Sequence, residues 1–281
     1  MISHTFIHIP GIGPKTEMRL WMQDITTLDE LAYTFGTDTE PDDEHGGRYS
    51  RTMKVIEDSL EALKDENWAY FYTMLPAREQ WRLIPCFKKP AFLDIETTGL
   101  GFLNNHITMI GIYDGSSVHS YIYGRNMDDF SRDIKKFDAV ITYNGKTFDL
   151  PFIKSCLGIT IDQPHIDLRY LLASLDLKGG LKKIERDLGI EREGAMKDIN
   201  GYMAVLLWNE YACKGDRSAL ETLAAYNCED VINLTPLAAR VYNMKLPEIF
   251  SHLILPETVT HPEIPFRINP ALVERLQHCK L

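Results

Sequence analysis

The stretch PAFLDIETTGLGF, residues 90–102, places two acids, Asp94 and Glu96, inside an apolar run that indicates a buried strand. Residues two apart in a strand project from the same face, so both carboxylates lie side by side. Two like charges held together away from water are unstable unless a cation neutralises them. Such oxygen ligands suit Mg²⁺ or Mn²⁺, and Gly99 lets backbone approach a ligand closely. The alternative is two exposed acids at a strand end.

The composition of the 281-residue chain is globular, with 44% hydrophobic and 25% charged residues. Its net charge of -10 argues against a general phosphate-binding surface but does not exclude a local basic groove. Five scattered cysteines without a CxxC pair favour a reducing compartment. No apolar stretch reaches the ~20 residues of a membrane span, and the start lacks the pattern of a signal peptide. We therefore expect a cytoplasmic protein that does not enter a membrane.

Hydrophobic periodicity divides the chain into three parts, predicted as an N-terminal helical accessory region (1–89), a central domain (90–243) and a tail packed on that domain (244–281). Strands are expected in the central domain at 91–96, 106–114, 117–124 and 139–144, with a turn at DGSS joining the second to the third. Helices are expected at 126–137, 148–158, 165–175, 179–190, 201–212 and 218–243. The predicted fold class is α/β, a mixed sheet flanked by helices, with a small N-terminal helical unit.

Two later segments carry acids of interest. ITYNGKTFDLPF places Asp149 after a buried strand and an NG turn, at a helix start, where the helix dipole favours an acid in any case. In AAYNCEDVINL, Tyr226 and Asp230 are four positions apart and therefore share one helix face. An aspartate in the middle of a helix is poorly favoured and needs a reason, although a hydrogen-bonded Tyr–Asp pair on the surface would also explain it.

Taken together and in this order, DIETTGL, YNGKTFDLPF and YxxxD resemble the three exonuclease motifs of the DEDD superfamily of ribonuclease H-like 3′–5′ exonucleases. The tyrosine of the third motif is similar to that of the tyrosine (DEDDy) subgroup. YNGKTFD resembles the second motif of proofreading domains in family B DNA polymerases. GGLKKIERDLGI and AYNCEDVINL resemble a set of stand-alone predicted prokaryotic exonucleases, and the whole resemblance covers residues 90–242.

The resemblance implies four metal ligands, namely Asp94, Glu96, Asp149 and Asp230. They would hold two Mg²⁺ or Mn²⁺ ions about 4 Å apart, one generating hydroxide and the other stabilising the leaving 3′ oxygen, with Asp94 bridging both ions. Tyr226 would position the attacking water, because a phenol with a pKa near 10 is a poor base at neutral pH.

The resemblance also implies that backbone around Thr97, Thr98 and Leu100 holds the terminal nucleotide, with Leu100 wedged against a base. An ordinary strand-ending turn is the alternative. Asn144 is a candidate for a substrate hydrogen bond or for bracing the site, and turn chemistry alone would also explain it. Asp167 is either a supporting acid behind the site or a helix cap.

Two further segments leave alternatives open. Lys178, Lys182, Lys183 and Arg186 gather near the start of one helix, where they would meet either phosphates or solvent. The PGIG segment, residues 10–13, resembles the hairpin of a helix-hairpin-helix DNA-binding motif, but too few residues precede it for a full first helix. Otherwise it is a tight turn that docks a small helical unit.

These features predict a metal-dependent 3′–5′ exonuclease that hydrolyses phosphodiester bonds of DNA, or of RNA, at single-stranded or frayed 3′ ends. Two alternatives remain, a catalytically inert ribonuclease H-like nucleic-acid-binding module and a structure-specific endonuclease on the same scaffold. The intact set of acids weighs against the inert module. The sequence identifies no protein partner.

Overall fold

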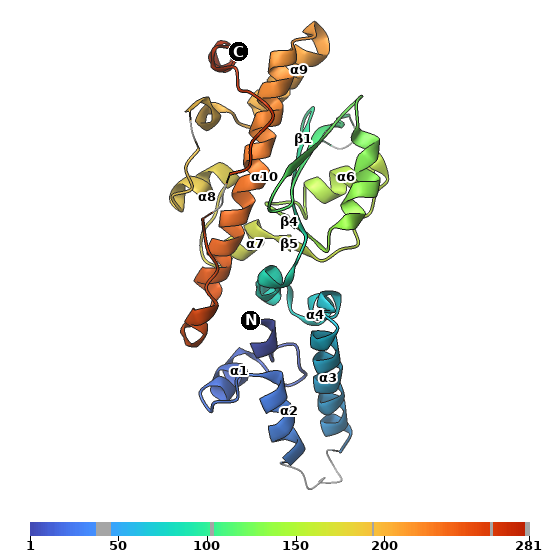
Figure 1. Ribbon diagram of the computed structural model, residues 1–281, viewed down its shortest axis with the longest axis vertical. Coiled ribbons are helices and arrows are strands. Elements are labelled where there is room, and N and C mark those ends of the chain that lie inside the picture. Colours follow the sequence, from blue (N-terminus) through green and yellow to red (C-terminus); the bar gives the residue numbers. More distant parts are fainter. Residues whose placement is uncertain (38–45, 102–103, 193, 259–260, 279–281) are drawn as a thin grey trace. The chain divides into compact units, whose positions relative to one another are not determined.

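The computed structural model describes residues 1–37, 46–101, 104–192, 194–258 and 261–278 (Figure 1). The chain forms two compact units, one made of Met1–Phe87 with Lys245–Ile254 and the other of Lys88–Met244 with Leu255–Leu281. The tail beyond residue 244 is therefore divided between the two units. Phe250 shows why, since its ring lies 5.0 Å from that of Trp21 in an edge-to-face contact within the N-terminal unit.

The N-terminal unit is helical. It contains α1 (Pro14–Trp21), α2 (Leu28–Thr37), α3 (Gly46–Lys64) and α4 (Trp68–Met74), with the 3₁₀ helices η1 (Ile2–His4), η2 (Ala77–Cys86) and η6 (Glu248–Leu253). The aromatic run that forms α4 is ambiguous between strand and helix by sequence. The Asn67 side chain caps this helix by accepting the backbone N–H of Tyr70 at 3.2 Å.

A buried ion pair organises the N-terminal unit. Glu17 on α1 and Arg82 on η2 are almost fully buried, and two hydrogen bonds of 2.9 and 2.8 Å join them. The Glu17 carboxylate also accepts the backbone N–H groups of Phe6 and Ile7. Burial of charge is tolerated in this paired and hydrogen-bonded form. The pair therefore fixes the segment that precedes the PGIG turn.

The PGIG segment forms a turn in which Gly11 has a φ of +87°, a left-handed conformation that favours glycine. Ile9 and Ile12 are buried, whereas Pro10 is exposed. Only the three-residue η1 precedes the turn, and α1 follows it directly with Pro14 at its first position. The turn thus docks α1 within this unit, and a nucleic-acid contact at this place remains a hypothesis.

The larger unit is built on a five-stranded mixed sheet with the order β3-β2-β1-β4-β5. Its strands are β1 (Pro90–Thr97), β2 (Ile107–Tyr113), β3 (Val118–Ile122), β4 (Ala139–Thr142) and β5 (His165–Asp167). β1 pairs antiparallel with β2 and parallel with β4, and the expected hairpin of β2 and β3 is present. The predicted α/β class with a mixed sheet is confirmed.

Two segments differ from the sequence-based expectation. Residues 165–167, expected within a helix, form β5, and α7 (Leu168–Ala173) begins only after them. A strand of three residues is too short to show alternation, so periodicity does not reveal it. Residues 126–137, expected as one helix, form the short pieces η3 (Met127–Asp129), α5 (Phe130–Asp133) and η4 (Ile134–Lys136).

Helices cover both faces of the sheet. On one face α6 (Asp149–Leu157) packs Phe152 and Ile153 into a core shared with Leu93 and Ile95 of β1. Figure 1 shows α10 (Arg217–Lys245) on the opposite side, where it and α9 (Gly201–Lys214) share a core with Met109 of β2. Further helices in this unit are α8 (Leu181–Asp187), η5 (Gly194–Asp198) and α11 (Pro270–Gln277).

The close approach of α10 to the sheet depends on Gly111 of β2. A Cβ atom at this position would lie 2.2 Å from Asn227 Oδ1 on α10, so only glycine fits. Gly111 pairs with Asp94 in the β1–β2 register, and Asn227 donates a hydrogen bond of 3.0 Å to the Asp94 carboxylate. Glycine therefore allows the helix to reach this acid.

Among the described residues, no helix is both long and apolar enough to cross a lipid bilayer. Cys86, Cys156, Cys213 and Cys228 are free thiols. Cys279 lies outside the described residues.

His8 gives the N-terminal unit a pH dependence that can be tested. Its ring is buried with Nε2 2.9 Å from Ser59 Oγ, and burial, followed by the charge of Arg82, lowers its pKa from 6.5 to about 4. The unfolded chain therefore binds a proton that the folded unit excludes, and stability is lost as the pH falls from about 6.5 towards 4. Between pH 7 and pH 5 this loss amounts to about 2 kcal/mol.

We expect His8→Gln to reduce the difference between the urea midpoints at pH 7 and pH 5. Tryptophan fluorescence reports on this unit because Trp21, Trp68 and Trp81 belong to it. The exposed His252 of the same unit supplies the control, and His252→Gln should keep the wild-type difference. A full wild-type difference in His8→Gln would show that another group causes the pH dependence.

Candidate metal centre

Three carboxylates from two elements meet in the larger unit. Asp94 and Glu96 project from β1 and Asp230 from α10, and each offers one oxygen that lies within 4.8 Å of the oxygens of the other two. Glu96 and Asp230 are buried and Asp94 is partly buried. The alternation of β1 puts the first two on one face, and α10 packs against that face with the third. Such a set of oxygens is the donor chemistry of a hard divalent cation.

Asp149 lies beside this cluster without joining the group of three. It is the first residue of α6 and is 2% exposed, and its Oδ1 accepts the backbone N–H of Ile95 at 3.1 Å. Ile95 lies between Asp94 and Glu96 in the strand. The structure therefore ties the fourth predicted ligand to the backbone between the first two.

Burial makes the cluster electrostatically unfavourable. Burial raises the pKa of Asp94 well above its ordinary value, and the charges of Asp230, Asp149 and Glu96 raise it further. Burial likewise raises the pKa of Glu96 well above its ordinary value and that of Asp149 to about 7. A site that destabilises its own anions gains from an added cation. The residues present therefore fit a divalent metal ion.

Two basic side chains that the sequence did not assign to the site face these acids. Arg192 Nη2 forms an ion pair of 2.5 Å with Asp230 Oδ1. Lys182 Nζ lies 4.5 Å from the centroid of the Tyr226 ring, and burial lowers the pKa of this lysine to about 8. By contrast, the adjacent Lys183 is exposed. The basic cluster in the sequence was a signal for Lys182, but no local pattern pointed to Arg192.

Tyr226 lies one helical turn before Asp230 and is 5% exposed. Burial raises the pKa of its phenol well above the ordinary value, and the charges of Asp230 and Glu96 raise it further. The phenol therefore keeps its proton at neutral pH and is available as a hydrogen-bond donor.

A cavity of about 550 Å³ lies in front of the acids. Its wall includes Asp94, Glu96, Asp230 and Tyr226 together with the turn at 97–100. The wall also carries the apolar or aromatic side chains of Leu100, Tyr143, Phe148 and Tyr202. A volume of this size is within the range of pockets that hold one small ligand.

The end of β1 and the turn that follows it contribute three predicted substrate contacts to the cavity wall, Thr97, Thr98 and Leu100. Thr97 Oγ1 donates to the Gly99 carbonyl at 2.7 Å, and Thr98 Oγ1 donates to Asn105 Oδ1 at 3.1 Å. Both hydroxyl groups therefore stabilise the conformation of the turn through hydrogen bonds inside it. Leu100 is 83% exposed, which leaves a large apolar side chain at the cavity in contact with solvent.

Asn144 does not line this cavity. Its backbone has a φ of +72°, and its side-chain oxygen accepts hydrogen bonds from Thr147 and Arg169. Asp167 caps α7 through the N–H of Arg169 and also accepts the N–H groups of Asn144 and Lys146 at 2.8 and 3.0 Å. Both side chains brace the loop that leads to Asp149.

A family model described as the RNase_H superfamily matches residues 91–242. The matched region contains the sheet except for Pro90, the first residue of β1, and all three carboxylates of the cluster. A search of curated proteins found no significant match. Because the family model covers more than half of the 281 residues, the chain belongs to the RNase H superfamily.

Proposed function

We propose that the chain is a metal-dependent 3′–5′ exonuclease of the DEDDy subgroup, which hydrolyses phosphodiester bonds of DNA, or of RNA, from a single-stranded or frayed 3′ end. The RNase H superfamily generally contains nucleases that use divalent metals, which supports a nucleic-acid substrate. The observation that carries the proposal is the meeting of Asp94, Glu96 and Asp230 within 4.8 Å in the wall of a cavity that also contains Tyr226.

Asp94, Glu96 and Asp230 would hold two Mg²⁺ or Mn²⁺ ions, with Asp149 completing the set from α6. Bound divalent ions would lower the pKa of a water molecule and offset the negative charge of the phosphodiester. The protein itself keeps the carboxylates oriented. Asn227 holds one oxygen of Asp94 by a hydrogen bond of 3.0 Å, and the N–H of Ile95 holds Asp149.

Tyr226 acts by position in this proposal. Its raised pKa excludes the phenolate as a base at neutral pH, so its hydroxyl donates a hydrogen bond that orients the attacking water or a phosphate oxygen. Asp230 lies on the same face of α10, so one helix presents both the donor and a carboxylate to the reacting phosphate.

The size and lining of the cavity support attack at a strand end. A volume of about 550 Å³ suits a terminal nucleotide rather than a continuous duplex. Tyr143, Phe148 and Tyr202 offer aromatic surface, on which unpaired bases stack without sequence preference. The exposed Leu100 is placed to contact the base of the last nucleotide.

One observation favours the inert nucleic-acid-binding module as a second candidate. The ion pair between Arg192 and Asp230 already supplies a cation to one member of the cluster. In a protein that never binds metal, this pair would keep the buried Asp230 carboxylate from being left without a counter-charge. The same pair is also compatible with an active enzyme in which it orients Asp230, so a cleavage assay decides between the two.

Cleavage of end-labelled oligonucleotides tests the proposal directly. With Mg²⁺ or Mn²⁺, a 5′-labelled strand should give a ladder of products that shorten from the 3′ end. Asp94→Asn removes a metal ligand and should reduce the rate by roughly 100-fold or more, because even supporting residues of metal sites cost 10- to 100-fold. DNA and RNA strands are tested side by side.

Asp162→Asn is the matched control, since Asp162 is an exposed carboxylate outside the cluster. It should cleave like the wild type. Binding of the strand without any cleavage in the wild type would support the inert module, and discrete internal cuts would support the endonuclease.

Tyr226→Phe separates positioning from metal binding. Loss of the hydroxyl should slow single-turnover cleavage by about 100-fold, a typical contribution of a group that manages protons in the transition state. The affinity for Mn²⁺, followed by electron paramagnetic resonance, should change by less than about twofold because the phenol is not a proposed ligand. An equal loss of metal affinity and rate would contradict this role.

Metal binding should also raise the free energy of unfolding of the protein. At a Mn²⁺ concentration of 100 times the Kd of a site, each ion bound should raise the wild-type unfolding free energy by about 2.7 kcal/mol. Without metal, Asp94→Asn should be at least as stable as the wild type because it removes one of the repelling charges, and Mn²⁺ should stabilise it less. Calorimetric scans with and without Mn²⁺ measure both effects, and equal stabilisation of the two proteins would exclude Asp94 as a ligand.

A further inference from the structure

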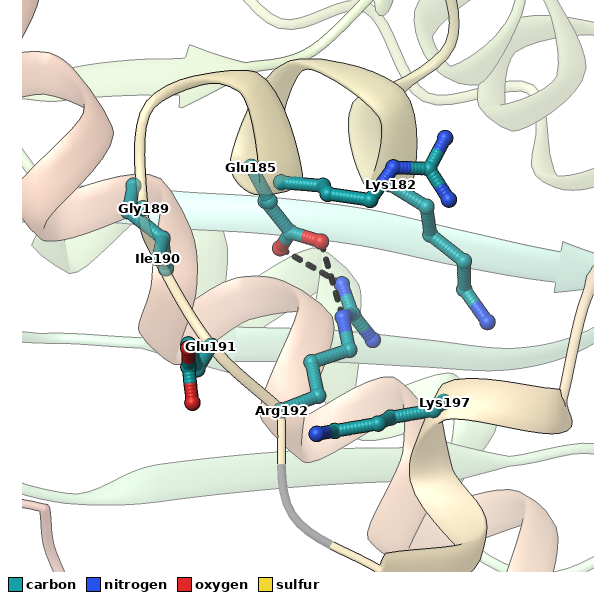
Figure 2. Close-up of a pocket in the computed structure, with 8 residues that line it drawn as sticks. Lys182, Glu185, Gly189, Ile190, Glu191, Arg192 and Lys197 are labelled. Atoms are coloured by element: carbon teal, nitrogen blue, oxygen red, sulfur yellow. Dashed lines mark hydrogen bonds and ion pairs between the residues drawn. The ribbon is translucent and has the colours of Figure 1, made fainter.

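A second, smaller cavity of about 240 Å³ lies beside the carboxylate cluster, between α8 and η5. Four cationic side chains line it, Lys182, Arg186, Arg192 and Lys197, with two acids, Glu185 and Glu191. Figure 2 shows the Arg192 guanidinium joined to the Glu185 carboxylate, with the Glu191 carboxylate directed away from it. The chain as a whole has a net charge of -10, so this basic cavity stands out from the rest of the protein.

Arg192 is held rigidly at the boundary between this cavity and the cluster. Its Nε and Nη2 donate to the two oxygens of Glu185 at 2.8 and 2.6 Å, and Asn233 donates to the same carboxylate at 3.1 Å. Nη2 also forms the ion pair with Asp230. The remaining Nη1 is buried and has no hydrogen-bond partner among the described residues. The side chain is 4% exposed, so water does not readily supply that partner.

Lys182 presents a second cation in the same wall, and the Tyr226 ring, 4.5 Å from its Nζ, is a contact that accepts no conventional hydrogen bond. Its Nζ is buried without a hydrogen-bond partner among the residues that the structure describes. A buried ammonium group without acceptors is costly, and so is an unpaired guanidinium N–H. Two such groups lining one cavity indicate that a ligand with several oxygen acceptors belongs there.

Charge and size define the ligand. Of the six ionisable groups in the wall, Glu185 is neutralised by Arg192, and Arg186 and Lys197 are exposed with no ion pair to any described residue. The cavity is therefore suited to an anion. At about 240 Å³ it is smaller than the roughly 300–1,000 Å³ of pockets that hold whole organic ligands, so it suits a single phosphate group.

We propose that the cavity between α8 and η5 is a phosphate-binding site, in which Lys182, Arg186, Arg192 and Lys197 hold a phosphate group next to the metal centre. This phosphate site depends on the proposed exonuclease function in one respect only, namely that nucleic acid is taken as the source of the phosphate. A phosphate of the strand backbone, beside the one that is cleaved, would fix the register of the strand. A released nucleoside monophosphate offers the same chemistry from a second source.

The test measures binding in EDTA, where cleavage does not interfere. A labelled oligonucleotide is titrated by fluorescence anisotropy over a range of salt concentrations, and inorganic phosphate and thymidine monophosphate are titrated by calorimetry. Arg186→Ala and Lys197→Ala remove exposed cations that make no hydrogen bond or ion pair with the described residues, so both variants should fold. Each should weaken oligonucleotide binding roughly threefold or more and reduce the salt slope by about 1.

Lys183→Ala is the control, because Lys183 is a neighbouring cation on α8 that is exposed, pairs with Asp187 and does not line the cavity. It should bind the strand with the wild-type slope. Weaker binding of the oligonucleotide in Arg186→Ala and Lys197→Ala identifies the strand backbone as the source. Weaker binding of thymidine monophosphate or inorganic phosphate alone identifies a released group.

Wild-type affinity of both variants for all three probes, or an equal loss in Lys183→Ala, would overturn the proposal. The outcome is independent of cleavage. A protein that binds phosphate here but never shortens a strand would keep the phosphate site and lose the exonuclease function. Cleavage from the 3′ end together with unchanged binding in both variants would support the exonuclease function and overturn the phosphate site.

Discussion

Repulsion among buried carboxylates is the constraint on which the larger unit depends. Two unit charges about 4 Å apart repel by about 4 kcal/mol at an effective dielectric constant of 20. The structure nevertheless holds Asp94, Glu96 and Asp230 within 4.8 Å of one another, because the elements that carry them are fixed by apolar cores on both faces of the sheet. Stability gained in those cores offsets a site that is unfavourable in isolation, as is common where groups are arranged for chemistry.

Two buried arginine–glutamate pairs in the described part of the chain, Arg82 with Glu17 and Arg192 with Glu185, have different roles. Arg82 is fully engaged, since its Nε, Nη1 and Nη2 all find acceptors on Glu79, Thr5 and Glu17. The pair of Arg82 and Glu17 therefore stabilises the core of the N-terminal unit. Arg192 also forms a bidentate pair, through Nε and Nη2 with Glu185, but it faces Asp230 and keeps Nη1 without an acceptor within the described part of the chain. All the side-chain nitrogens of Arg82 have hydrogen-bond acceptors, whereas Nη1 of Arg192 has none among the described residues. This difference distinguishes a pair that only stabilises the fold from a pair at a binding site.

Sequence reasoning succeeded where the chemistry is local. The alternation of β1 predicted that Asp94 and Glu96 share a face, and helix periodicity put Tyr226 with Asp230. It failed where three-dimensional folding alone decides. A strand of three residues, such as β5, is too short to be recognised from its sequence pattern. Arg192 reaches the acids only because the chain turns back after α8. Within the tail, Phe250 contacts Trp21 of the N-terminal unit, a packing contact that no periodic pattern encodes.

The contact between Gly111 and Asn227 limits the order in which this chain can change during evolution. A methyl group at position 111 collides with the Asn227 amide, so it is acceptable only after that side chain has become smaller. A smaller residue at 227, however, abandons the hydrogen bond to Asp94. The two positions are therefore coupled, and lineages that retain the acid should vary them together or not at all. The distance between α10 and β2 and the orientation of the Asp94 carboxylate are therefore expected to be conserved together.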